Sequence, residues 1–99
     1  MSYKGQLEKE LYSYRSMLAA LENDGPEEIK AVKSKRVEAI NRALASLTYT
    51  EKEIIEQKYF TPAQLSDRTL SWDMEIGLTT FYKYKEQALR KMANALNFI

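Results

Sequence analysis

The chain lacks both cysteine and histidine, and it has only three glycines and two prolines in 99 residues. Without cysteine there is no disulfide, no thiolate metal site and no cysteine nucleophile. Without histidine the chain also lacks the commonest general base near neutral pH and the commonest nitrogen ligand for transition metals. These absences argue against an enzyme, and we expect no metal site and no cofactor.

Long hydrophobic runs are missing as well. No apolar stretch approaches the roughly 20 residues that span a bilayer, or the roughly 7–15 residues of a signal-peptide core. We therefore expect a cytoplasmic protein without a membrane segment. With 44% hydrophobic and 29% charged residues, the composition is that of a soluble globular domain, and the scarcity of glycine and proline favours long helices.

The N-terminal half predicts two helices joined by a tight turn. One apolar seam has the three- and four-residue spacing of a helix face and comprises Leu7, Leu11, Tyr14, Leu18 and Leu21. Residues 23–26, Asn-Asp-Gly-Pro, then predict a turn, because glycine ends helices and proline begins them. A second helix is expected over residues 26–45, with an apolar face of Ile29, Val32, Val37, Ile40, Ala43, Leu44 and Leu47. This antiparallel hairpin can pack on itself, on the C-terminal half or across a homodimer, and the sequence leaves these arrangements open.

A third helix is expected over residues 51–59. Thr50 and Glu53 have the spacing of a capping box, which predicts Thr50 as the cap. The inward face would be Ile54, Ile55, the stem of Lys58, and Tyr59. The pattern thus divides the chain into a helical hairpin over residues 1–47 and a second unit over residues 48–99. We expect the two units together to form one compact domain.

Two helical patterns on either side of Gly77 predict a helix-turn-helix in the second unit. The first helix, over residues 67–75, has Ser66 as its expected cap and the small Ser71 where a partner helix would cross. Its inner side would be Leu70 and Met74, and Trp72 is expected to be half-buried. Ile76 would fill the corner, and Gly77 would permit the change of direction and cap the next helix.

The last helix, expected over residues 78–97, carries the candidate functional surface. Its buried side would be Phe81, Tyr84 or the stem of Lys85, Ala88, Leu89, Met92 and Leu96. Its outward side at the start would be Leu78, Thr79, Tyr82, Lys83 and Glu86. In helix-turn-helix proteins these positions reach base edges in the major groove. Phosphate contacts are expected from Lys83, Lys85, Arg90 and Lys91.

The distribution of charge supports this placement. The net charge is only +1, so overall basicity does not indicate nucleic acid. From residue 77 onward, however, four basic residues oppose only Glu86, which gives +3, whereas residues 48–76 carry three basic and six acidic residues, which gives −3. Positive charge is therefore concentrated on the helix proposed to meet phosphate. A second basic stretch, Lys30 to Arg36, is left open as a contact to DNA backbone, a partner or solvent.

Residues 69–89, Thr-Leu-Ser-Trp-Asp-Met-Glu-Ile-Gly-Leu-Thr-Thr-Phe-Tyr-Lys-Tyr-Lys-Glu-Gln-Ala-Leu, resemble the C-terminal helix-turn-helix of ArpU/RinA-type phage regulators. The fold of that unit is similar to region 4 of bacterial sigma factors. Residues 53–60 and 88–96 also resemble this family, so that the resemblance covers about half the chain. It implies an all-α, sigma-region-4-like protein of four to five helices that binds double-stranded DNA and regulates late genes of a phage or prophage.

Two other functions remain open. Helix-turn-helix units also occur in DNA-packaging proteins such as small terminase subunits, so the chain can instead be a packaging or assembly protein. It can also be a non-enzymatic module that binds RNA polymerase or a sigma factor without reading DNA.

Overall fold

The computed structural model describes residues 3–22, 27–63 and 65–99, and every regular element in these ranges is a helix. The helices are α1 (Tyr3–Tyr12), α2 (Tyr14–Glu22), α3 (Glu27–Leu44), α4 (Tyr49–Tyr59), α5 (Asp67–Asp73) and α6 (Leu78–Ala95). The prediction of an all-α fold is confirmed. None of these helices combines the length and the apolar character needed to cross a membrane. The turn expected at residues 23–26 lies outside the described residues.

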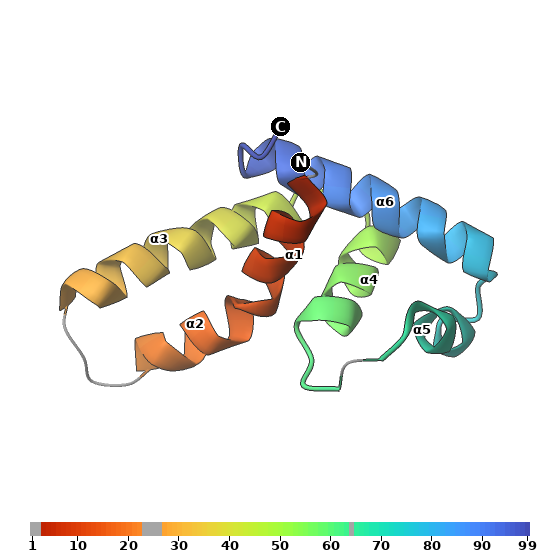
Figure 1. Cartoon of the computed structure of the whole chain (residues 1–99), viewed down its shortest axis with the longest axis horizontal. Coiled ribbons are helices and arrows are strands. Elements are labelled where there is room, and N and C mark those ends of the chain that lie inside the picture. The colour runs from red at the N-terminus through yellow and green to blue at the C-terminus, as the bar shows by residue number, and fades with distance from the viewer. Residues whose placement is uncertain (1–2, 23–26, 64) are drawn as a thin grey trace.

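Helix α6 is the central element of the molecule, because it contacts α1, α3, α4 and α5. Helices α2 and α3 lie side by side, run in opposite directions and extend away from α4, α5 and α6 (Figure 1). The molecule is accordingly elongated, measuring 45 × 28 × 26 Å. The start of α6 and the far end of the α2–α3 hairpin therefore lie at opposite ends of the long axis (Figure 1).

The main core joins the two halves of the chain. Leu7 and Leu11 of α1 belong to the same buried cluster as Leu89 and Met92 of α6. The other buried members are Met17, Val37, Ile40, Ala43, Leu44, Ile55, Tyr59, Ala88 and Ala93. The hairpin and the C-terminal unit thus share one buried cluster of side chains.

The first expected helix is in fact two helices, which separate at Ser13. The Ser13 hydroxyl donates to the carbonyl oxygen of Lys9 at 2.9 Å, and the Ser13 amide donates to the same oxygen at 3.1 Å. A serine that bonds back to the preceding turn in this way tends to bend a helix. The inward face changes after the break, since Met17 is buried and Leu18 is 37% exposed. The prediction that Leu18 lies on a buried seam is therefore wrong.

The second expected helix, α3, is buried only along its C-terminal half. Val37, Ile40, Ala43 and Leu44 are buried as predicted, and Leu47 beyond the helix is half-buried. Ile29 and Val32 are 51% and 60% exposed, so their expected place in the core is wrong. The core ends short of them because α6 packs near the opposite end of α3 (Figure 1).

Helix α4 begins two residues earlier than expected because Thr48, rather than Thr50, is its cap. The Thr48 hydroxyl accepts from the amide of Glu51 at 3.3 Å, and the Glu51 carboxylate accepts from the amide of Thr48 at 2.9 Å. Thr48 with Glu51 and Thr50 with Glu53 have the same spacing, so the sequence alone does not separate them. Burial decides in favour of Glu51, which is 1% exposed and receives Lys91 at 2.7 Å. The predicted inward face of Ile54, Ile55 and Tyr59 is confirmed.

Candidate nucleic-acid interface

Helices α5 and α6 are joined by a short corner and pack around a small core of their own. Ile54 of α4, Leu70 of α5 and Phe81 of α6 are buried together there. The partly buried side chains around them are Leu65, Met74, Ile76 and Tyr84. The prediction that Ile76 fills the corner is confirmed. We call α5, the corner and α6 the α5–α6 unit.

Two serines set the geometry of α5. Ser66 caps the helix, since its hydroxyl accepts from the amide of Thr69 at 3.2 Å. Ser71 is 4% exposed, and its hydroxyl donates to the carbonyl oxygen of Arg68 at 2.8 Å, so the buried oxygen is satisfied within its own helix. Both predictions, a cap at Ser66 and a small buried residue at Ser71, are confirmed.

The corner between α5 and α6 bends at Glu75 and not at the glycine. Glu75 has a φ of 57°, in the left-handed region, whereas Gly77 is extended at φ −65° and ψ 150°. Gly77 is the N-cap of α6, as expected, without a side-chain hydrogen bond. A Cβ atom at Gly77 would meet only the Thr80 hydroxyl at 4.0 Å. The expectation that glycine supplies the conformational freedom of this corner is therefore wrong.

A largely buried ion-pair network fixes α6 to α4 and α5. The Nζ atom of Lys85 lies 2.6 Å from Oδ2 of Asp67, and Nζ of Lys58 lies 3.1 Å from Oδ1. Lys58 also donates to the carbonyl oxygen of Leu65 at 3.1 Å. Burial acts to raise the pKa of Asp67, but the two lysines outweigh it and lower the pKa. Because the Lys85 ammonium is paired with Asp67 within the protein, the expectation that it contacts phosphate is wrong.

The outward side of α6 carries most of the remaining predicted contact residues. Thr79 and Lys83 are exposed, and Tyr82 is 45% exposed with the Lys85 ammonium 5.6 Å from its ring centroid. Leu78 is only half-buried. Lys83 forms no ion pair with any residue that the structure describes. These side chains thus stand together on the first two turns.

Some of the charged residues further along α6 are exposed to solvent, and others form ion pairs within the protein. Arg90 is exposed, as expected. Glu86 is exposed but pairs with Lys4 of α1, and Lys91 pairs with Glu51. Sequence reasoning did not find either pair, because each joins segments that are far apart in the chain.

The candidate interface is therefore the α6 face that comprises Thr79, Tyr82, Lys83 and Arg90. Comparison of the chain with protein-family models, with curated proteins and with solved structures finds no match. The chemistry of the face follows from its side chains, which present two hydroxyl groups and two cations. Such groups donate hydrogen bonds to base acceptors and to phosphate oxygens.

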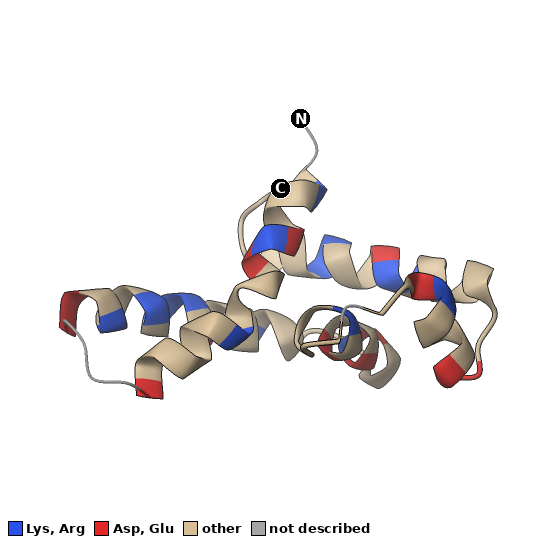
Figure 2. Cartoon of the chain, turned by 60° about the horizontal axis from the view of Figure 1, so that its bottom comes forward, with Lys and Arg blue, Asp and Glu red and all other residues tan. Residues whose placement is uncertain are grey.

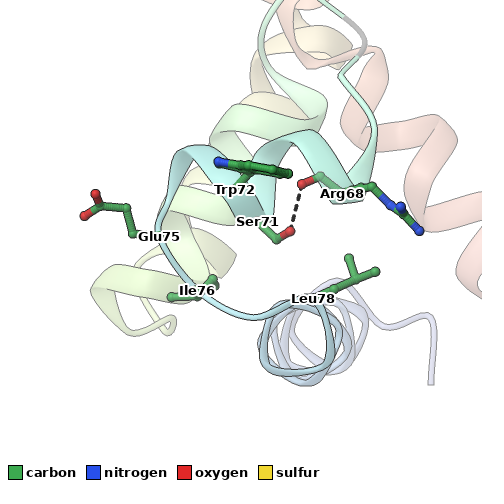
Figure 3. A pocket seen from close by; sticks show the side chains of 6 residues that line it. All are labelled: Arg68, Ser71, Trp72, Glu75, Ile76 and Leu78. Carbon is green, nitrogen blue, oxygen red and sulfur yellow. Dashed lines mark hydrogen bonds between the residues drawn. The ribbon is translucent and has the colours of Figure 1, made fainter.

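A shallow hollow of about 620 Å³ lies beside this face, between α5 and the start of α6. Its lining is Arg68, Ser71, Trp72, Glu75, Ile76 and Leu78 (Figure 3). Trp72 is 79% exposed, so the expectation that it is half-buried is wrong. Sequence reasoning missed Arg68, although Arg68 and Trp72 are four residues apart and therefore share one face of α5.

Proposed function

We propose that this chain is a sequence-specific DNA-binding protein that regulates transcription, and that the first two turns of α6 enter the major groove. One observation carries the proposal: Thr79, Tyr82 and Lys83 are exposed together, while Phe81 between them in sequence is fully buried. A helix anchored by one side and polar on the other has the form of a recognition helix in a helix-turn-helix protein.

The side chains of this face suit base edges. Lys83 can donate to O6 and N7 of guanine, and the Thr79 hydroxyl can donate to or accept from several bases. Tyr82 reaches either a base or a phosphate with its hydroxyl group. The exposed part of Leu78 offers an apolar contact to a thymine methyl group. These contacts would provide the sequence preference.

Phosphate contacts would come from fewer residues than the sequence suggests. Lys85 and Lys91 are paired with Asp67 and Glu51, which leaves Lys83 and Arg90 on the proposed face. Each neutralised phosphate contributes about −0.9 to the slope of log K against log salt concentration. Arg90 therefore contributes a slope of about −0.9, and Lys83 adds a second contribution of about −0.9 only where it contacts a phosphate instead of a base.

The biological setting is proposed from the resemblance to ArpU/RinA-type regulators. It is control of phage or prophage late genes in the cytoplasm of a bacterial host, without catalysis. A packaging protein related in architecture to small terminase subunits would use the same DNA contacts from within a ring. Light scattering distinguishes the two, because a ring is a large oligomer and a regulator of this kind is a monomer or dimer.

The decisive experiment is selection of bound sequences from a random pool of double-stranded DNA, followed by comparison of two variants. We expect Lys83→Ala to weaken binding to the selected site by about 5- to 100-fold, as for loss of a base contact, and to relax the preference at one position. Lys52→Ala, a matched change at an exposed lysine on α4, should leave affinity unchanged. Unchanged affinity and footprint in Lys83→Ala would refute the placement of α6 in the groove.

The exposed Trp72 favours a second candidate, a module that binds RNA polymerase or a sigma factor. Tryptophan is enriched at the centres of protein interfaces, and here it lines the same hollow as the apolar side chains of Ile76 and Leu78. Capture of purified RNA polymerase that persists after nuclease treatment and disappears in Trp72→Ala would support this candidate. Capture that depends on DNA supports the first proposal.

A further inference from the structure

The N-terminal half of α3 has an apolar stripe that the described residues leave uncovered. Ile29 and Val32 are 51% and 60% exposed, whereas Val37 and Ile40 further along the helix are buried. The stripe lies on the α2–α3 hairpin, which extends away from the rest of the molecule (Figure 1). A second molecule can therefore approach it without meeting α5 or the start of α6.

The charges beside this stripe are ordered along the helix. Glu28 and Lys35 are seven residues apart, so they lie two turns apart on one edge of the stripe. Ile29 and Arg36 have the same separation and lie on the other edge, with Val32 between the edges. The helix is acidic at its start and basic further along (Figure 2).

We propose that this face of α3 pairs with the same face of a second copy of the chain, about a two-fold axis at Val32. The two helices are then antiparallel, and the axis keeps each edge on its own side. Glu28 of one copy therefore meets Lys35 of the second copy, and this pair occurs twice by symmetry. Ile29 meets the aliphatic stem of Arg36 from the second copy, and the two Val32 side chains meet at the axis.

Self-complementarity is the reason to choose a second copy as the occupant. Neither Glu28 nor Lys35 forms an ion pair with any described residue, so both are available to a partner. Arg36 is bound by Glu10, with Nε to Oε1 at 2.8 Å, so its charge is already paired within the chain.

The overlap of the two helices also fits the burial of α3. A two-fold axis at Val32 places Glu27 opposite Val37 of the second copy, so that only residues 27–37 of each helix overlap. Further along α3, Ile40, Ala43 and Leu44 are buried in the core of their own chain and stay outside the contact. The exposed stripe and the overlap therefore coincide. One pair of short helix segments buries less area than a standard interface. The dimer should therefore be weak, with a dissociation constant on the order of 10–100 μM.

A charge exchange tests this pairing by sedimentation velocity over a range of concentrations. Glu28→Lys places two lysines at each pair, and Lys35→Glu places two carboxylates there, so each variant alone should dimerise at least about tenfold more weakly. An equimolar mixture of the two variants restores both pairs and should recover the dimer. Val32→Ser should weaken the dimer as well, without any change of charge.

The control is Glu38→Lys, an equal change of charge at an exposed position of α3 outside the stripe. It should dimerise like the unaltered chain, and circular dichroism should show that all variants keep their helix content. The proposal is overturned if the unaltered chain is monomeric up to a concentration of about 0.5 mM, which is several times the largest dissociation constant expected. It is also overturned if the mixture fails to recover the dimer, or if Glu38→Lys dissociates it equally.

Discussion

At the scale of single residues, Asp67 of α5 ties α6 to α4 through two ion pairs. Its carboxylate lies between Lys85 and Lys58, and the three side chains are only 15–17% exposed. Breaking a buried ion pair by removing one partner costs more than forming it gains, because an uncompensated charge stays behind. The loss of Asp67 would leave two such lysines close together.

We therefore predict that Asp67→Asn destabilises the protein by about 2–4 kcal/mol at pH 7. Because the pKa of Asp67 is lowered on folding, its stabilisation is complete above the unfolded-state pKa, about 3.9, and is lost as pH falls through the folded-state pKa. The difference in urea midpoint between variant and unaltered chain should narrow below about pH 4. Asp73→Asn, at an exposed aspartate of α5, is the control. A difference that is constant from pH 7 to pH 2 would show that the carboxylate charge is not responsible.

At the scale of elements, the start of α4 depends on a cap that also reaches α6. Glu51 closes the capping box with Thr48 and also receives Lys91. One carboxylate thus accepts from the Thr48 amide at the start of α4 and forms an ion pair with Lys91 of α6. Burial acts to raise the pKa of Glu51, and the bonds from Lys91 and Thr48 outweigh it and lower the pKa. The carboxylate is therefore charged at neutral pH.

We predict that Thr48→Ala destabilises the protein by about 1 kcal/mol, the usual effect of removing a helix cap. Thr50→Ala should change stability by less than about 0.5 kcal/mol, because Thr50 lies within the first turn and caps nothing. Thermal unfolding of the two variants measures the difference directly. An equal effect of both substitutions, or a larger one for Thr50→Ala, would contradict the assignment of Thr48 as the cap.

Helical periodicity is sufficient to predict α3, α4, α5 and α6, because each helix has apolar residues at three- and four-residue spacing along its buried face. Periodicity does not register a serine that bonds to the preceding turn, so the break at Ser13 was missed. It also does not report how far a core extends, so Ile29 was placed inside. The left-handed residue at Glu75 was missed because glycine is the residue that sequence rules associate with such turns.

The candidate interface could be predicted only in part for a similar reason. Phe81 has the helical spacing of a core residue, and the exposed positions of Thr79 and Lys83 follow from it. Whether a lysine on that helix is available depends on the carboxylates that tertiary packing brings near it. The sequence predicts Lys85 as available to DNA, whereas it is paired within the protein. Its partner Asp67 belongs to another helix, so helical spacing does not indicate the pair.

At the scale of the whole molecule, α1 connects the hairpin to the proposed DNA-binding half. The hydroxyl group of Tyr59 in α4 is buried and donates to Glu8 of α1 at 2.9 Å. Burial, together with this hydrogen bond, raises the pKa of Tyr59, so the phenol stays protonated throughout the physiological range. The Tyr59 ring also packs edge-on against Tyr12, with ring centroids 5.0 Å apart. The two parts of the chain that the pattern divides near residue 47 are therefore in direct contact.

This shared core predicts that residues 48–99 do not fold stably on their own. Without α1 to α3, the buried side chains of Ile55, Tyr59, Leu89 and Met92 would lose their cover. Each exposed side chain costs about 2 kcal/mol, and the sum is comparable to the whole stability of a small domain, about 5–15 kcal/mol. Circular dichroism and heating of this fragment should show reduced helix content and no cooperative transition, whereas the complete chain unfolds in one step. A sharp transition in the fragment would mean that the cluster around Phe81 is enough to hold α4, α5 and α6 together, and that the hairpin is an accessory to the proposed DNA-binding unit.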